Sequence, residues 1–366
     1  MIAFAIDTVL LLVAAGIAAV TAILGAVTLA MAWWHRRTRR RTARIRDRVR
    51  EGVFERLFEP DPGWAAWIGG LSGAEREQLR RVVEAHLRRL RGTEYDRLRT
   101  LAGELGIQAE AKRDLEAGRN RFRALTWLAL LGEPVAVSRL EECCTETRRH
   151  RAGAARLLFE SGHPDGAAVG TDLLIGDGGR PLSAFGMDTL YRLNDGGDTP
   201  LLERIPEDGG AWDGRLLVQV LTVLRYCSIT EPPEQLEWVP DALAHDSPQV
   251  RAAAVGVIER HGWRDPVQRW IDVAELLADP EPTVRYDVYQ LLASWGTDRS
   301  AAWLREGLDA EDDREVLAVV RALSRHPRAS LPDPTGRLEP FVEWVQADAA
   351  VGRRRERVWG VTAAWS

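Results

Sequence analysis

Lysine is almost absent from this chain of 366 residues, and cysteine is scarce. Of the 49 basic residues only Lys112 is a lysine, so arginine carries nearly all of the positive charge. The adjacent Cys143 and Cys144 and the distant Cys227 have neither CxxC spacing nor a neighbouring histidine cluster. Neither a disulfide framework nor a zinc site is therefore indicated. We interpret the thiols as residues of helix faces in a reducing compartment, with a redox role for the adjacent pair as the alternative.

The chain also lacks the motifs of common catalytic sites. It contains no Gly-x-Ser-x-Gly elbow, His-Glu-x-x-His pair, Walker loop or kinase-type set. The seven histidines are scattered, and the glycine-rich stretch 162–214 has neither a preceding strand pattern nor the Gly-x-Gly-x-x-Gly order of a nucleotide-binding loop. We therefore predict no catalytic residue, no metal site, no cofactor and no enzymatic activity.

Positive charge is concentrated in one short segment. The chain is 45% hydrophobic and 28% charged, which indicates a folded protein. Residues 36–50 contain nine arginines and one aspartate, whereas the whole chain carries a net charge of −5, so the remainder carries about −13. An acidic body of this kind repels nucleic acid, and we expect no nucleic-acid partner.

A long uncharged run precedes this basic segment. Residues 8–34 are rich in Leu, Val, Ile and Ala and contain no charged residue. As a helix, the run would be longer than the roughly 30 Å hydrocarbon core of a bilayer. Trp33 and Trp34 are predicted interface anchors at its end, and the arginines that follow place the C-terminal side in the cytoplasm. A cleaved signal peptide is the alternative, but it requires a basic leading region and a shorter apolar run.

The segment 35–58 keeps helical spacing of apolar residues between its arginines, which predicts an amphipathic helix on the anionic membrane surface. The alternative, which can hold at the same time, is that these arginines act only as a topology signal. The residues that we expect to bind the membrane surface are Arg36, Arg37, Arg39, Arg40, Arg41 and Arg44.

The first part of the soluble body reads as a linker followed by capped helices. Two prolines and a glycine in 59–63 break the preceding helix. Ser72 and Glu75 have the spacing of a capping box. Thr93 is predicted to cap the next helix, and a single helical run is expected from about residue 109 to 131.

A sequence pattern recurs in the C-terminal half at a spacing near 33 residues. The copies begin near Asp246, Asp279 and Asp312, and the valine that follows each aspartate is separated from the next by 34 and then 32 residues. Each copy is followed by an apolar stripe with helical spacing and ends at a Gly or Pro. A second amphipathic segment precedes the later two copies, at 266–277 and 300–308. Fainter copies upstream keep spacings near 28 to 34 residues, so the unit is a stacked pair of antiparallel helices.

The copy Asp246-Ser-Pro-Gln-Val-Arg-Ala-Ala-Ala resembles the HEAT-repeat family (armadillo-like α-solenoids), whose second helix typically begins with an Asp-x-x-x-Val-Arg-x-x-Ala pattern. We predict an all-α fold, an α-solenoid of about seven HEAT-like helix pairs preceded by one N-terminal transmembrane helix. The predicted organisation is a transmembrane anchor over 1–34, a basic juxtamembrane helix over 35–58, a linker over 59–71, N-terminal capping helices over 72–106, the HEAT-like solenoid over 107–346 and a C-terminal tail over 347–366.

We expect a scaffold in the cell membrane, with a single span, the N-terminus outside and a cytoplasmic solenoid that binds an unidentified, membrane-associated protein partner. Arg251 and Arg285 are the candidate partner-binding residues, and the alternative is that each bridges to the aspartate of a neighbouring repeat. Two other functions remain open: an accessory subunit of a membrane-embedded enzyme or transporter, and a lyase-like enzyme, which the family resemblance allows.

Overall fold

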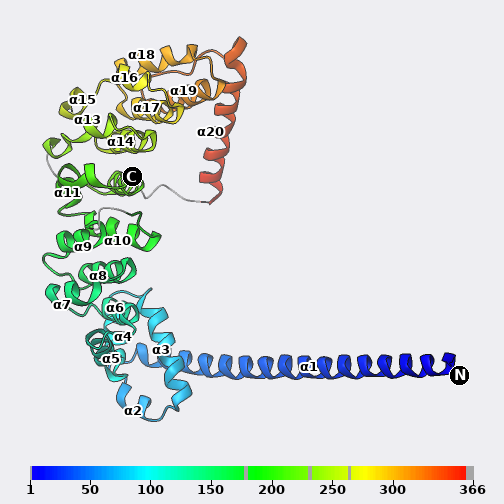
Figure 1. The fold of residues 1–366 in the computed structure, drawn as a ribbon. Coiled ribbons are helices and arrows are strands. Elements are labelled where there is room, and N and C mark those ends of the chain that lie inside the picture. The colour runs from blue at the N-terminus through cyan, green and yellow to red at the C-terminus, as the bar shows by residue number, and fades with distance from the viewer. Residues whose placement is uncertain (1, 177–179, 230–232, 263–264, 360–366) are drawn as a thin grey trace. The chain divides into compact units, whose positions relative to one another are not determined.

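The computed structural model describes residues 2–176, 180–229, 233–262 and 265–359 (Figure 1). The side chains of 2–23, 26, 38–41, 233, 265–266 and 351–359 are not described. The described residues form helices and connecting loops with no strand among them, which confirms the all-α class. They separate into two compact units, Met1–Glu133 and Pro134–Ser366.

Unit 1 consists of one long helix and five shorter ones. These are α1 (Ile2–Leu57), α2 (Trp64–Gly69), α3 (Gly73–Leu87), α4 (Thr93–Glu104), α5 (Ile107–Glu116) and α6 (Arg121–Leu130). Val49, Val53 and Leu57 form one buried stripe of α1, and α3 and α4 pack against this helix. The N-terminal part of α1 extends away from the other helices of the unit (Figure 1).

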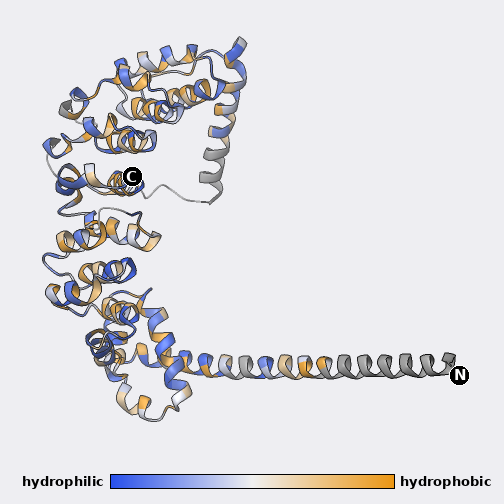
Figure 2. Ribbon diagram, viewed as in Figure 1, coloured by the Kyte–Doolittle hydropathy of each residue, from blue (hydrophilic) through white to orange (hydrophobic). Residues whose placement is uncertain are grey.

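The hydropathy of the described part of α1 changes along the helix. Figure 2 shows hydrophobic residues near 24–34 followed by mainly hydrophilic ones toward Leu57. Within the part of the chain whose side chains are described, no helix is long and apolar enough to cross a membrane. The predicted span 8–34 consists largely of residues 8–23 and 26, whose side chains lie outside the described set.

The local signals of unit 1 were partly predicted. The Ser72 capping box is confirmed, because its hydroxyl accepts from the Glu75 amide and the Glu75 carboxylate accepts from the Ser72 amide at 2.9 Å. The Thr93 cap is wrong: Gly92 is the N-cap with φ 72°, and Thr93 is the first helical residue. A glycine adopts this positive φ without steric cost, so it starts the helix where a threonine cannot.

The single helical run expected over 109–131 is also wrong, because α5 and α6 occupy this range as separate helices. Gly118 has φ 69° and Asn120 φ 46°, and two left-handed residues so close together reverse the chain. The range 59–71, predicted as a linker, contains α2, whose Trp64 and Ile68 are buried.

Unit 2 is a stack of helix pairs with one final helix. Its α-helices are α7 (Val137–Cys144), α8 (Arg148–Glu160), α9 (Gly166–Ile175), α10 (Ala184–Asn194), α11 (Leu201–Asp208), α12 (Gly214–Tyr226), α13 (Val239–Leu243), α14 (Pro248–His261), α15 (Asp265–Arg269), α16 (Val273–Leu277), α17 (Pro282–Trp295), α18 (Asp298–Glu306), α19 (Asp313–Arg325) and α20 (Glu339–Trp359), with short 3-10 turns at Gly209–Ala211, Pro233–Leu236, Gly307–Asp309 and Gly336–Leu338. The second helices α8, α10, α12, α14, α17 and α19 pack in this order, each on the next.

The recurring valine explains why the second helices stack. Val250, Val284 and Val316 are fully buried at the same place in α14, α17 and α19. Burial of such a side chain contributes about 1.5–3 kcal/mol. The predicted second helices are therefore confirmed, and α17 ends at Gly296 in the left-handed conformation that a helix C-cap favours.

The first helix of the penultimate repeat differs from the prediction. A single segment was expected over 266–277, but α15 and α16 are separated at Trp270–Asp272. Asp272 accepts from the amides of Ala274 and Glu275 at 3.0 and 3.3 Å and so begins a new helix. Residues of this break and of α18 line the same cavity.

The C-terminal helix closes the stack. Val342 and Val345 of α20 pack with Val316 and Val320 of α19, so α20 caps the last repeat. Helix α20 continues into the range 347–366 predicted as a tail, and residues 360–366 lie outside the described residues.

Candidate partner-binding surfaces

Arg251 joins two successive repeats. Its Nε and Nη2 donate to the Asp279 carboxylate at 2.7 and 2.8 Å, and Nη1 donates to the His245 carbonyl at 2.9 Å. The two side chains are 14% and 7% exposed. The hydrogen bonds from Arg251 hold the pKa of Asp279 below its usual value, and the same contact raises the pKa of the arginine.

Arg285 repeats this arrangement one unit further along. It donates to the Glu315 carboxylate at 2.8 and 2.7 Å and to the Asp279 carbonyl at 2.7 Å, with side chains 19% and 10% exposed. The Tyr289 hydroxyl also donates to Glu315 at 2.7 Å. Hydrogen bonds from Arg285 lower the pKa of Glu315, and burial raises the pKa of Tyr289.

The alternative role predicted for these arginines, a bridge to the aspartate of a neighbouring repeat, is confirmed for Arg251, whose partner is Asp279. Arg285 also bridges to the next repeat, but its partner there is Glu315 and not an aspartate. Their planar guanidinium groups are occupied by two-pronged carboxylate bonds and have little exposed area. Binding of a partner through Arg251 and Arg285 stays a prediction, and the geometry first assigns them a part in holding the repeats together. Sequence reasoning did not identify the Tyr289 contact.

A second set of inter-repeat contacts follows the same helices. Arg156 of α8 pairs with Asp188 of α10, and Arg225 of α12 pairs with Glu259 of α14. Arg325 of α19 donates to the Gln290 side chain of α17 at 2.7 Å. Polar bonds therefore link neighbouring second helices through most of unit 2.

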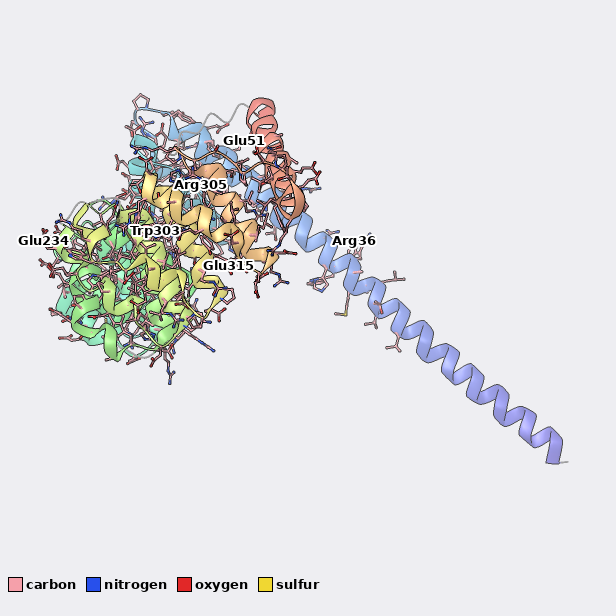
Figure 3. All side chains as sticks on the ribbon, turned by 90° about the horizontal axis from the view of Figure 1, so that it is seen from above. Arg36, Glu51, Glu234, Trp303, Arg305 and Glu315 are labelled. Carbon is pink, nitrogen blue, oxygen red and sulfur yellow. The ribbon has the colours of Figure 1, made fainter. Side chains whose placement is uncertain are left out.

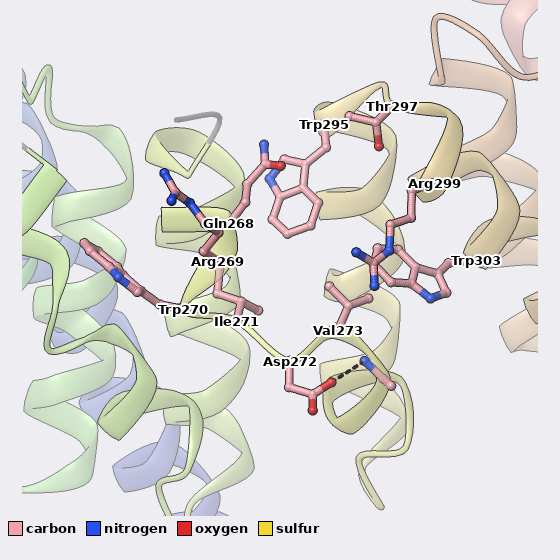
Figure 4. A pocket seen from close by; sticks show the side chains of 11 residues that line it. Gln268, Arg269, Trp270, Ile271, Asp272, Val273, Trp295, Thr297, Arg299 and Trp303 are labelled. Carbon is pink, nitrogen blue, oxygen red and sulfur yellow. Dashed lines mark hydrogen bonds between the residues drawn. The ribbon is translucent and has the colours of Figure 1, made fainter. Parts of the chain in front are cut away.

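An open cavity lies beside the break between α15 and α16. Its volume is about 860 Å³. Its lining consists of Gln268, Arg269, Trp270, Ile271, Asp272, Val273, Ala274, Trp295, Thr297, Arg299 and Trp303. In Figure 4, the Trp295 indole lies above Ile271 and Val273, the Trp303 indole lies on the far side of Val273, and Trp270 points away from them. None of the sites predicted from the sequence includes these residues.

The cavity carries a guanidinium in a fixed place. The Arg299 guanidinium carbon lies 4.5 Å from the ring centroid of Trp303, a cation–π contact (Figure 4). Arg299 is exposed, and Arg269 is a second arginine of the lining. The single lining carboxylate, Asp272, is engaged by the amides at the start of α16. The lining thus carries a net positive charge.

The predicted membrane-facing residues lie on α1. Trp33 and Trp34 are exposed, and the Arg37 guanidinium carbon lies 5.2 Å from the Trp33 ring centroid. Arg36, labelled in Figure 3, projects from the helix, and Arg44 is also exposed. The remaining three predicted arginines, Arg39, Arg40 and Arg41, have side chains outside the described set.

The three thiols lie in the interior of unit 2. Cys143, Cys144 and Cys227 are buried and form no disulfide among the described residues, and the sulfur atoms of the adjacent pair lie 3.4 Å apart. Among the residues described, no three His, Cys, Asp or Glu side chains form a group that could hold a metal ion. The absence of a catalytic residue, metal, cofactor and enzymatic activity stays a prediction.

The stacked second helices define unit 2 as an α-solenoid of helix pairs. Comparison with known proteins adds that residues 236–324 match the family model for HEAT repeats, which supports the resemblance inferred from the sequence. This range covers α13 to α19 and includes the cavity. No curated protein matches the chain, and no solved structure matches it.

Proposed function

We propose that this protein is a membrane-anchored scaffold whose HEAT-like solenoid binds a protein partner at the cytoplasmic face of the membrane. The observation that carries the proposal is the combination of an uncharged run of membrane-spanning length with a stack of helix pairs on one chain. Each of the two parts has its own physical support.

The anchoring role rests on residues 8–34 and the arginines that follow. The run is long enough to span a bilayer, and the described apolar side chains near its end, such as Leu29 and Met31, are exposed. Large exposed apolar side chains are costly in water but favourable in lipid. The nine arginines of 36–50 favour the cytoplasmic side and an anionic lipid surface.

The binding role rests on the repeats. HEAT repeats commonly mediate protein–protein interaction, and residues 236–324 match them. A helical stack has no single central pocket and instead offers long lateral surfaces to a partner. We therefore assign binding to the solenoid and anchoring to α1.

Affinity purification of the tagged full-length chain from detergent-solubilised cells, followed by mass spectrometry, tests this proposal. Residues 1–58 with the same tag are the control bait, because they retain the span and the arginines. We expect one or a few membrane-associated proteins enriched by the full chain alone. Enrichment of the same proteins by both baits, or of none, would refute a binding role for the solenoid.

A further inference from the structure

We propose that the cavity beside α15, α16 and α18 is a docking groove for an extended, acidic, proline-containing segment of a partner protein. This inference rests on the proposed scaffold function, for which it supplies a site and a partner chemistry. Four observations lead to it: the apolar floor, the two indole walls, the stacked arginine and the charge of the lining.

The apolar and aromatic lining of the cavity favours a peptide ligand that binds through its side chains and not through its backbone. Ile271 and Val273 lie below the Trp295 indole, and Val273 separates it from the Trp303 indole (Figure 4). Helices and one short loop line the cavity, so no strand edge is available there for pairing with a peptide backbone. Proline-rich segments need no such pairing, because their polyproline II helix is preformed and packs its rings against aromatic side chains.

The arginines of the lining determine the sign of the charge that the ligand must carry. Stacking on Trp303 limits the freedom of the Arg299 side chain, so this side chain loses less conformational entropy when it binds a carboxylate. Two acidic side chains nearby contact other groups. Asp272 accepts amide hydrogen bonds, and the Asp298 carboxylate lies 3.8 Å from Arg328. Among the described residues no carboxylate forms an ion pair with Arg299, which leaves its guanidinium available to an acidic residue of the ligand.

Two cavities of unit 1 show that a positively charged lining is not common to the cavities of this chain. One, of about 560 Å³, is lined by Asp61, Glu104 and a single arginine, Arg97, among others. The second, of about 360 Å³, is lined by Glu104, Glu133 and Arg99. Both linings carry a net negative charge, in contrast to the groove between Trp295 and Trp303.

The chain also supplies a matched control for the arginine–indole pair. Arg321 of α19 stacks on Trp344 of α20 with its guanidinium carbon 4.3 Å from the ring centroid, and neither residue lines the groove. Arg321→Glu and Trp344→Ala therefore repeat the chemical changes of Arg299→Glu and Trp303→Ala at another position of unit 2.

Fluorescence anisotropy of labelled decapeptides with the full-length chain in detergent tests the groove. The probes are (Glu-Pro)₅, (Gln-Pro)₅, (Lys-Pro)₅ and (Glu-Ala)₅. We expect (Glu-Pro)₅ to bind with a Kd on the order of 10–100 µM, as small transient interfaces do, and to weaken with added salt. Arg299→Glu and Trp303→Ala should each weaken it about tenfold or more, and the two control variants by less than about twofold.

Several results would overturn the inference. These are failure of (Glu-Pro)₅ to bind, binding of (Gln-Pro)₅, (Lys-Pro)₅ or (Glu-Ala)₅ as tight as that of (Glu-Pro)₅, and equal losses in the groove and control variants. Self-association of the chain that Arg299→Glu abolishes would also overturn it, because a second copy would then be the occupant. Circular dichroism confirms that each variant is folded. Partners that still co-purify with Arg299→Glu would leave the scaffold function standing and refute this groove alone.

Discussion

At the level of single residues, the arginine of each repeat signature holds its neighbour in place. We expect Arg251→Ala to lower the free energy of unfolding by about 2–4 kcal/mol, because it leaves the largely buried Asp279 carboxylate without its partner. Arg305→Ala, a change at an exposed position of α18, should stay within about 0.5 kcal/mol. Urea unfolding followed by circular dichroism measures both. Equal effects of the two variants would contradict the structural role of Arg251.

Two aspartates of unit 2 should respond in opposite ways to removal of their charge. Hydrogen bonds from Arg251 lower the pKa of Asp279, so its stabilising contribution is present above the ordinary value of 3.8 and is lost as the pH falls through the lowered one. Burial raises the pKa of Asp287, so its ionisation costs stability as the pH rises through the raised value. At pH 7, Asp279→Asn should lower the Tm and Asp287→Asn should raise it.

Thermal unfolding of both variants and of the wild type, at pH 7 and on the acid side, checks these signs. The difference between Asp279→Asn and the wild type should shrink as the pH falls below the ordinary aspartate value. Shifts of the same sign at pH 7 would refute the assignment.

Side-chain contacts were predicted correctly from the sequence where the repeat spacing places the two residues next to each other. An aspartate partner for Arg251 and Arg285 was among the predicted alternatives, because stacked repeats bring equivalent positions together. Arg251 pairs with Asp279 as predicted, whereas Arg285 pairs with Glu315. Tyr289 and the Arg299–Trp303 pair were missed, because their roles depend on which face of a helix meets its neighbour. The tryptophans at 270, 295 and 303 were the available sequence signal for the cavity.

At the level of helices, the close packing of α12 on α14 depends on Gly256. A methyl group at this position would lie 3.0 Å from Arg225 Nη1 and 3.1 Å from its Cδ, so the side chain that pairs with Glu259 would have to move. We expect Gly256→Ala to cost about 1 kcal/mol in spite of the better helix propensity of alanine.

Gly214→Ala is the control for this prediction, because no atom lies within 4 Å of the methyl group that it would add at the start of α12. It should leave stability unchanged or raise it by up to about 1 kcal/mol. Urea unfolding compares the two variants. A stabilising Gly256→Ala would show that Arg225 moves without loss.

Helices were predicted best where buried apolar residues recur at a regular spacing. The second helices follow from the spacing of Val250, Val284 and Val316, which all lie in the core. The break at Trp270–Asp272 was missed, because the apolar pattern continues across it and only the capping side chain of Asp272 marks the new helix. The helix starts near Gly92 and Gly118 depend on positive φ, which composition alone does not locate.

At the level of the whole molecule, the described residues contain seven helix pairs between α5 and α19, in agreement with the predicted number. The boundary between the compact units falls after Glu133, inside the range predicted as one solenoid. Glu133 accepts hydrogen bonds from Arg99 and Lys112 of unit 1 at 3.0 and 3.2 Å. The bonded residues are 34 and 21 positions apart in the sequence, and the two bonds hold Glu133, just after α6, in unit 1. The spacing of the repeats does not predict these bonds.

The central claim is that one chain joins a membrane span to a binding solenoid, and alkaline carbonate extraction of cell membranes tests its first half most directly. The full-length chain should stay in the membrane pellet, because carbonate removes peripheral proteins but not a spanning helix. Val20→Arg together with Leu24→Arg should release it, since each charge near the centre of the run costs about 2.5–3.5 kcal/mol of insertion free energy. Arg321→Glu, a charge change in the solenoid, should stay in the pellet. Release of the wild-type chain by carbonate would contradict the account.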